Sequence, residues 1–304
     1  MADTRFRAAE LRFLDPAVIA RLGTLELKAR TIVEGFLSGL HRSPFRGFSV
    51  EFAEYRQYLP GDDPSTIDWK VYARSDRHYV KKYEEDTNLE CYLLVDVSGS
   101  MAYGSRGITK QQYAAYLAAS LAYLMNRQRD AVGLMAFDDE IVSMLSPSAR
   151  PGHLRSLLVA LDRLPEGGAT NAARPLNRLA EAMSRRGLVV LISDLLDEPS
   201  RVIEGLKHFR FRGTDVVVFH VLDPDELTFP FERAARFRDL EGDEEIVAVP
   251  SAVRETYLAE LGAMLDRYKR ELGSAGIDYV RLDTSQPLEF GLMSYLSTRG
   301  RVAR

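Results

Sequence analysis

Short apolar runs alternate with helix-forming segments from residue 89 to the end of the chain. Most of the runs are nearly continuous in apolar residues, which is typical of strands that helices cover on both faces. Strands that alternate with helices in this way form parallel pairs, so we predict an α/β fold with a doubly wound, mainly parallel sheet. The runs occupy residues 89–97, 131–137, 187–193, 214–222 and 275–282.

Capping residues indicate where the intervening helices begin. Thr109 and Gln112 resemble a capping box, and Asn171 is expected to cap a later helix. The short run at 140–145 is predicted to be an antiparallel edge strand. We expect helices in the apolar run 113–125 after the capping box and at 151–164, 171–187, 199–212, 251–273 and 287–298.

Two regions depart from this alternation. Residues 1–86 begin with an expected helix at 15–41 and continue with an aromatic-rich segment that contains the strings PGDD and IDW. We assign them to an N-terminal helical and β-rich extension, and residues 87–304 to the main domain. Within that domain, residues 229–249 have the pattern of a β-hairpin insertion that turns at 241–243.

Charge and composition exclude several classes of function. The net charge is −4 and no dense Lys/Arg tract is present, so nucleic acid is not an expected partner. A single cysteine cannot form an internal disulfide, which fits a reducing compartment. The N-terminus lacks the apolar stretch of a signal peptide, and the longest apolar run, 114–125, is too short to span a bilayer. We therefore expect a cytoplasmic protein with no integral membrane segment.

Hard oxygen ligands follow the ends of two predicted strands. Asp96, Ser98 and Ser100 leave the first strand at spacings of two, so a curled loop can point all three at one position. Asp194 ends the strand at 187–193, and Thr170 lies in the loop GGAT. Ligands of doubly wound sheets gather at the carboxyl ends of strands, and such oxygens suit Mg²⁺ or Mn²⁺. We predict that these five residues bind a divalent metal, with an open position for an acidic side chain of a partner.

Each part of this pattern also has a simpler interpretation. Asp-x-Ser-x-Ser is by itself more often a polar turn than a metal site. An Asp after a strand, such as Asp194, or a Thr before a helix, such as Thr170, is often only a helix cap. The joint placement of the three parts on the same strand edges favours the metal site.

Three strings are similar to the metal-ion-dependent adhesion site of von Willebrand factor A domains: VDVSGSM (95–101), GGAT (167–170) and ISDLLD (192–197). The resemblance covers about residues 87–299. It implies that the Asp and two Ser of the first string bind metal, while Thr170 and Asp194 contribute directly or through water. It also implies a site that binds a protein partner rather than one that catalyses a reaction.

The string YRQYLPGDDPSTIDWKVYAR (55–74) resembles a bacterial family catalogued as domain of unknown function 58. Members are commonly encoded beside MoxR-type AAA+ ATPases and are thought to act with them as adaptors in remodelling or maturation of client proteins. Many members carry transmembrane helices before this string, so the chain resembles the soluble subgroup. It departs from the pattern at Ser65, where many members have a basic residue.

A haloacid dehalogenase-like, Mg-dependent phosphatase is the enzymatic alternative, with Asp96 as nucleophile and Asp194 with Asp197 as metal ligands. That chemistry needs a second carboxyl two residues after the nucleophile as general acid, and the chain has Ser98 there. A serine hydrolase is disfavoured because VSGSM lacks the Gly-x-Ser-x-Gly elbow. A scaffold with a vestigial metal loop is the third possibility. We expect a protein that is not an enzyme.

Overall fold

The computed structural model describes residues 15–42, 54–57, 79–82, 90–165, 167–168, 172–183, 186–242 and 244–302. The chain divides into two units, Met1–Ser38 with Leu89–Arg304 and Gly39–Asn88. In the smaller unit, β1 (Glu54–Gln57) pairs antiparallel with β2 (Tyr79–Lys82). The PGDD and IDW strings lie outside the described residues, so the domain boundary at residue 86 stays a prediction.

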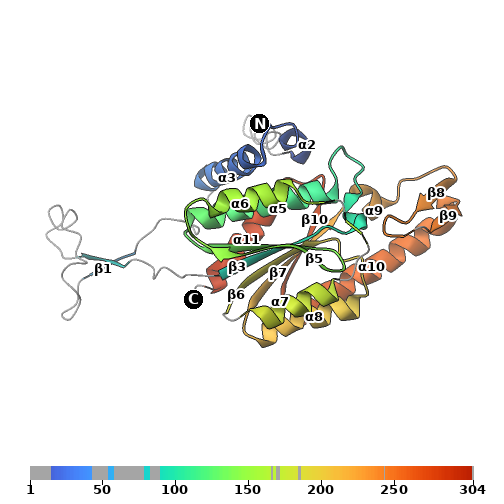
Figure 1. Cartoon of the computed structure of the whole chain (residues 1–304). Coiled ribbons are helices and arrows are strands. Elements are labelled where there is room, and N and C mark those ends of the chain that lie inside the picture. Colours follow the sequence, from blue (N-terminus) through green and yellow to red (C-terminus); the bar gives the residue numbers. More distant parts are fainter. Residues whose placement is uncertain are drawn as a thin grey trace. The chain divides into compact units, whose positions relative to one another are not determined.

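A six-stranded sheet forms the centre of the larger unit (Figure 1). Its strands are β3 (Glu90–Asp96), β4 (Ala131–Phe137), β5 (Ile141–Ser148), β6 (Gly187–Ser193), β7 (Asp215–Leu222) and β10 (Asp278–Asp283). They lie in the order β10-β7-β6-β3-β4-β5, and only the β4–β5 pair is antiparallel. The predicted doubly wound, mainly parallel α/β fold is therefore confirmed, including the antiparallel edge strand.

Helices cover both faces of this sheet. Figure 1 shows α5, α6 and α11 on one side and α7, α8 and α10 on the other. Apolar side chains of α7, α8 and α10 pack with alternate residues of the strands in one buried cluster. All seven residues of β6 are buried, which explains its continuous apolar run. The helices are α5 (Lys110–Arg127), α6 (His153–Asp162), α7 (Ala173–Ala182), α8 (Pro199–Phe211), α10 (Pro250–Ser274) and α11 (Glu289–Val302).

Capping at the start of α5 follows the sequence pattern. The Thr109 hydroxyl accepts a hydrogen bond from the Gln112 amide at 3.1 Å, and the Gln112 side chain accepts one from the Thr109 amide at 3.2 Å. This box fixes the entry of the chain into α5 and so orients the residue that follows it. Asn171, the predicted cap of α7, lies outside the described residues.

The single N-terminal helix predicted at 15–41 is wrong. The structure has two helices, α2 (Pro16–Ile19) and α3 (Leu25–Arg42), separated by a turn. Thr24 explains the restart, because its hydroxyl accepts a hydrogen bond from the Leu27 amide at 3.2 Å. α3 packs on the domain through a buried apolar face, and Lys28 Nζ donates to the Tyr116 hydroxyl of α5 at 3.0 Å.

The segment after β7 contains a short helix and a hairpin. α9 (Pro224–Thr228) is followed by β8 (Ala235–Arg238), which pairs antiparallel with β9 (Glu245–Ala248). Arg254 of α10 ties this segment down by donating to the carbonyls of Phe229 at 3.0 Å and Phe231 at 2.6 Å. Among the helices of the described residues, none is long and apolar enough to cross a membrane.

Candidate metal site at the switch point of the sheet

The chain reverses its direction of winding at β3. From β3 the sheet continues to β4 and β5 on one side, and the later strands β6, β7 and β10 lie on the other. Helices leaving such neighbouring strands diverge, which opens a crevice at their carboxyl ends. Asp96 is the last residue of β3, and Asp194 directly follows β6. Both carboxylates therefore stand at the position where doubly wound folds bind ligands.

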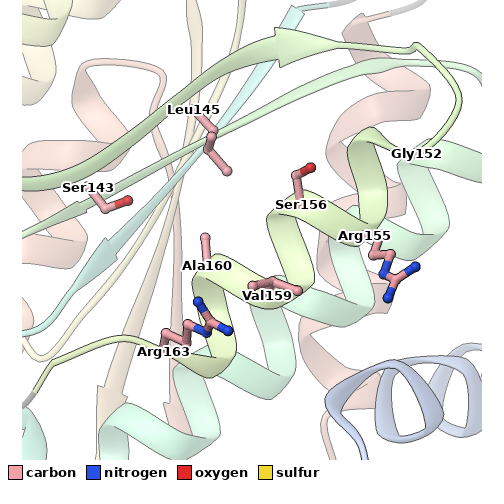
Figure 2. Close-up of a pocket in the computed structure, with 8 residues that line it drawn as sticks. All are labelled: Ser143, Leu145, Gly152, Arg155, Ser156, Val159, Ala160 and Arg163. Carbon is pink, nitrogen blue, oxygen red and sulfur yellow. The ribbon is translucent and has the colours of Figure 1, made fainter.

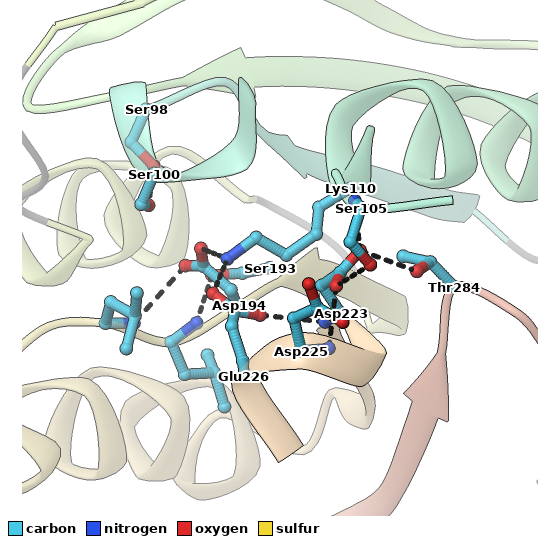
Figure 3. A network of polar contacts seen from close by, with 12 residues as sticks. Ser98, Ser100, Ser105, Lys110, Ser193, Asp194, Asp223, Asp225, Glu226 and Thr284 are labelled. Atoms are coloured by element: carbon cyan, nitrogen blue, oxygen red, sulfur yellow. Dashed lines mark hydrogen bonds and ion pairs between the residues drawn. The ribbon is translucent and has the colours of Figure 1, made fainter. Parts of the chain in front are cut away.

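The loop after β3 folds back onto Asp96. The Ser98 amide donates to Asp96 Oδ1 at 2.9 Å, and the Ser193 hydroxyl donates to Asp96 Oδ2 at 2.5 Å. A short 3-10 turn, η3 (Gly99–Ala102), then brings the Ser100 hydroxyl to 3.1 Å from that of Ser98 (Figure 3). The predicted curl of Asp96, Ser98 and Ser100 is thus formed by hydrogen bonds within the loop.

These polar groups are almost completely withdrawn from solvent. Asp96 and Asp194 are 0% exposed, Ser98 is 1% exposed and Ser100 is 7% exposed. Burial, together with the negative charge of Asp194, raises the pKa of Asp96 to about 7, although hydrogen bonds from Ser193 and Ser98 oppose the shift. The ionised form of Asp96 is therefore poorly stabilised by the protein alone, and a bound cation would stabilise it.

Thr170 itself lies outside the described residues, but Gly167, Gly168 and Ala172, which are close to it in the sequence, contact the site. The Gly99 amide donates to the Gly168 carbonyl at 2.8 Å. A Cβ on Gly167 would lie 1.9 Å from the Val97 carbonyl oxygen, so only glycine permits this close approach. On the other side, the Ala172 amide donates to Asp197 Oδ2 at 3.0 Å. The loop is therefore joined to both strand ends that carry Asp96 and Asp194.

Lys110, the first residue of α5, is a site residue that the sequence analysis missed. Its ammonium donates to Asp194 Oδ2 at 2.7 Å and to Glu226 Oε1 at 2.6 Å, and its side chain is fully buried (Figure 3). Burial opposes its charge, but the attraction of Asp194 and Glu226 is stronger and raises its pKa. Lys110 is therefore the positive centre of the crevice.

A signal for Lys110 was present in the sequence. A cation in the first turn of a helix is unfavourable, because the amino end of the helix already carries partial positive charge. A lysine in this position at the switch point is therefore expected to pair with acidic side chains from neighbouring strands. Glu226 is supplied by α9, at the end of β7, where sequence alone showed only an Asp-Pro-Asp-Glu string.

A second buried carboxylate extends the network away from Lys110. Asp223 accepts hydrogen bonds from the Ser105 amide at 2.9 Å, the Ser105 hydroxyl at 2.5 Å and the Thr284 hydroxyl at 3.3 Å (Figure 3). Its own amide donates to Glu226 Oε2 at 2.7 Å. Polar contacts thus connect the carboxyl ends of β6, β7 and β10 with the segment that precedes α5.

The donor set fits a hard divalent cation. Among the described residues no three His, Cys, Asp or Glu side chains are grouped to hold a metal, so an ion here must use hydroxyl oxygens. Two Mg²⁺ ligands at right angles lie about 3 Å apart, and the hydroxyls of Ser98 and Ser100 are separated by 3.1 Å. Two carboxylates, from Asp194 and Glu226, share the single ammonium of Lys110, so the crevice retains an excess of negative charge even when Asp96 is protonated.

Asp194 fits a less direct role. Lys110 engages its Oδ2, and its Oδ1 accepts a hydrogen bond from the Leu196 amide at 3.3 Å. Both oxygens are therefore already used by the protein. Both oxygens of Asp96 also accept hydrogen bonds, but its donors, the Ser98 amide and the Ser193 hydroxyl, are neutral. Lys110 already supplies a counter-charge to Asp194, so Asp194 is less suited to direct ligation than Asp96, Ser98 and Ser100.

The turn of the β8–β9 hairpin covers this loop. A Cβ added to Gly99 would lie 2.2 Å from the Leu240 carbonyl oxygen and 3.4 Å from Cγ of Glu241. The two backbones are in contact only because residue 99 has no side chain. The hairpin therefore forms part of the rim of the crevice.

Comparison with known proteins gives uncharacterized relatives. An uncharacterized protein of Mycobacterium bovis and uncharacterized proteins of Mycobacterium tuberculosis are each 27% identical to this chain over 293 residues. The match covers 95% of this chain and 92% of theirs.

Solved structures with a similar course of the chain are more distant. BatB from Bacteroides thetaiotaomicron is 18% identical, with 69% of this chain and 98% of that chain covered and a TM-score of 0.47. The VWA domain of SpRpn10 is 15% identical, with coverages of 69% and 94% and a TM-score of 0.37.

The family resemblance carried by residues 55–74 is confirmed by a longer match. Residues 54–264, more than half of the chain, match the family described as Protein of unknown function DUF58. This match includes the strands and loops that carry Asp96, Ser98, Ser100 and Asp194. The chain belongs to the DUF58 family.

Proposed function

We propose that the chain is a non-enzymatic, divalent-metal-dependent adaptor that binds other proteins. The observation that carries the proposal is the convergence of Asp96, Ser98 and Ser100 at the switch point of the sheet. Mg²⁺ or Mn²⁺ is the proposed ion. When bound, it supplies an electrophilic position for a carboxylate of the partner.

The residues around the ion have separate roles in this proposal. Asp96, Ser98 and Ser100 hold the metal directly, and Thr170 and Asp194 contribute directly or through water. The hydroxyl of Ser193 fixes the orientation of the Asp96 carboxylate. Lys110 neutralises Asp194 and limits the negative charge that the metal has to balance.

The proposed partner is a MoxR-type AAA+ ATPase, and the proposed process is the remodelling or maturation of client proteins. Membership of the DUF58 family supports this choice, because the sequence resemblance implies such an ATPase as a neighbour. The acidic side chain that completes the metal shell would come from the ATPase or from the client. Adaptors of this kind need no reacting group, which is consistent with Ser98 at the position where a phosphatase requires an acid.

Calorimetry with MgCl₂ tests the metal site. We expect binding heat with the full chain and its loss in Asp96→Ala and in the double variant Ser98→Ala/Ser100→Ala. Asp139→Ala is the matched control, because it removes an exposed carboxylate from the turn after the neighbouring strand β4. Circular dichroism of each variant establishes that it is folded.

Absence of heat with the folded wild-type chain, for Mg²⁺ and Mn²⁺ alike, would overturn the metal site. Release of phosphate from p-nitrophenyl phosphate that disappears in Asp96→Ala would instead support the phosphatase. For the partner, tagged wild type and Asp96→Ala are purified from the native host and analysed by mass spectrometry. We expect an AAA+ ATPase with the wild type and its depletion with the variant; recovery of no such ATPase would overturn the adaptor role.

A further inference from the structure

One long edge of the central sheet is formed by β5. This strand pairs only with β4, and its other edge has no strand partner among the described residues. Its sequence, IVSMLSPS, contains no charged side chain. Charged residues are a common protection against strand pairing and are absent here, so the obstacles are Pro147 and the register irregularity opposite Ile141 and Ser143. Residues 141–146 therefore offer an unprotected stretch of edge.

A groove of about 450 Å³ lies between this edge and α6 (Figure 2). Ser143 and Leu145 line it from β5, and α6 contributes small and apolar side chains such as Ala160 and Val159. Val159 is 42% exposed in the groove. Val142 and Met144 alternate with Ser143 and Leu145, so they point to the other face of the sheet, where they are 40% and 43% exposed. Apolar surface thus borders the free edge.

Two arginines stand at the groove without internal partners. Arg155 lines it from α6 and Arg163 from the position directly after this helix, and both are exposed. Within the part of the chain that the structure describes, neither guanidinium group forms a hydrogen bond or an ion pair, unlike that of Arg174, which pairs with Glu140 at 3.2 Å. Unpaired guanidinium groups beside a strand edge are suited to bind carboxylates.

From these observations we propose that the β5–α6 groove binds an extended acidic segment of another protein, which adds a strand to β5. Backbone hydrogen bonds along residues 141–146 hold the segment, and Arg155 and Arg163 bind its acidic side chains. This surface is separate from the metal site, and the proposal does not depend on the proposed function.

The spacing of the two arginines defines the segment further. Arg163 follows Arg155 by eight positions, which corresponds to about 12 Å along the axis of α6. In an extended strand, residues i and i+4 point to the same face and lie about 13 Å apart. The groove is therefore matched to acidic residues at i and i+4 with an apolar residue between them, above Val159 and Ala160.

Charge argues against a second copy of this chain as the occupant. A symmetric antiparallel pair of β5 strands would bring α6 of one chain alongside α6 of the other. The arginines at the two grooves would then lie close to each other, with Arg155 of one chain toward Arg163 of the other, and such like charges repel each other. Acidic side chains of a partner would instead attract the two arginines.

Fluorescence anisotropy with a labelled peptide, Thr-Glu-Thr-Val-Thr-Glu-Thr, tests the proposal on the full chain. We expect saturable binding that weakens at least tenfold in Arg155→Glu/Arg163→Glu. Arg178→Glu/Lys207→Glu is the matched control, since both residues are exposed on helices of the opposite face and the change in charge is equal. This control should bind like the wild type.

Two further peptides separate strand addition from general attraction. One places the glutamates at i and i+3, on opposite faces, and the other carries N-methyl groups that remove backbone donors; both should bind at least fivefold more weakly. Equal binding by Arg155→Glu/Arg163→Glu, or equal binding of the methylated peptide, would overturn the proposal. So would sedimentation showing a wild-type dimer that excludes the peptide, because the occupant would then be a second copy.

Discussion

The carboxyl-end crevice and the β5 edge differ in the burial and pairing of their charged side chains. In the crevice, Lys110 is fully buried and bonded to two carboxylates, so its charge is used within the fold. At the β5 edge, Arg155 and Arg163 are exposed and have no partner among the described residues. Buried charges are tolerated only when they are paired, whereas exposed ones need no partner for folding. The first set therefore holds loops in place, and the second remains available for another molecule.

Lys110→Met should produce the largest loss of stability. It leaves Asp194 and Glu226 without their cation, and breaking a buried pair in this way costs about 3–5 kcal/mol. Urea unfolding at pH 7 measures the change in the free energy of unfolding. Arg236→Met is the control, because the Arg236–Glu245 pair is exposed and contributes only about 0–1 kcal/mol. Equal losses for the two variants would contradict the contrast between the crevice and the surface.

The pH dependence of stability tests whether the imidazole of His220, on strand β7, is held neutral in the folded protein. It is fully buried, and its Nδ1 lies 2.7 Å from the Tyr279 hydroxyl, with the Tyr268 ring edge-on to it. Burial lowers its pKa to about 4 from 6.5; the charge of Asp194 opposes this shift, and those of Lys110 and Arg281 add to it. Between these values the unfolded chain binds the extra proton, so stability falls as the pH falls.

The expected contribution of His220 is on the order of 3 kcal/mol lost by pH 4. The variant His220→Gln should lack this pH-dependent loss of stability. The free energies of unfolding of wild type and variant, measured from pH 7.5 to pH 4, should therefore converge or cross as the pH falls. Parallel profiles would show that the imidazole is not held neutral in the folded protein.

Arg155→Glu/Arg163→Glu should have the smallest effect on stability. Neither side chain contacts a partner among the described residues, and surface substitutions of this kind change stability by about 0.5 kcal/mol or less. Thermal unfolding measures it against the wild type. A loss above about 2 kcal/mol would place these arginines in the internal structure and would contradict their availability for binding.

The sheet could be predicted from the sequence because the apolar runs that form its strands are nearly continuous. Strands buried on both faces are continuous apolar runs, and β6 has seven buried residues in succession. Asp96 and Asp194 could be assigned to one edge of the sheet, since parallel strands end on the same side. The prediction of a single N-terminal helix was wrong because a periodic pattern does not reveal an interruption as short as the turn before Thr24.

Lys110 and Glu226 could not be joined from the sequence. They are separated by 116 positions, and their contact depends on α5 and α9 meeting above the ends of the strands. The groove at β5 was equally hidden, because the pattern identified an edge strand but not which helix lies beside it. Pair contacts between distant elements depend on packing, which local periodicity does not encode.

The contact between Gly99 and the hairpin turn has a consequence for partner choice. Under the proposed function, a carboxylate must reach a site whose residues are no more than 7% exposed and beside which Leu240 and Glu241 lie against Gly99. The turn would stop a broad, flat protein surface. A narrow projecting loop with a single acid at its tip has the matching shape. The length of the hairpin would thus limit which proteins can bind at the metal site.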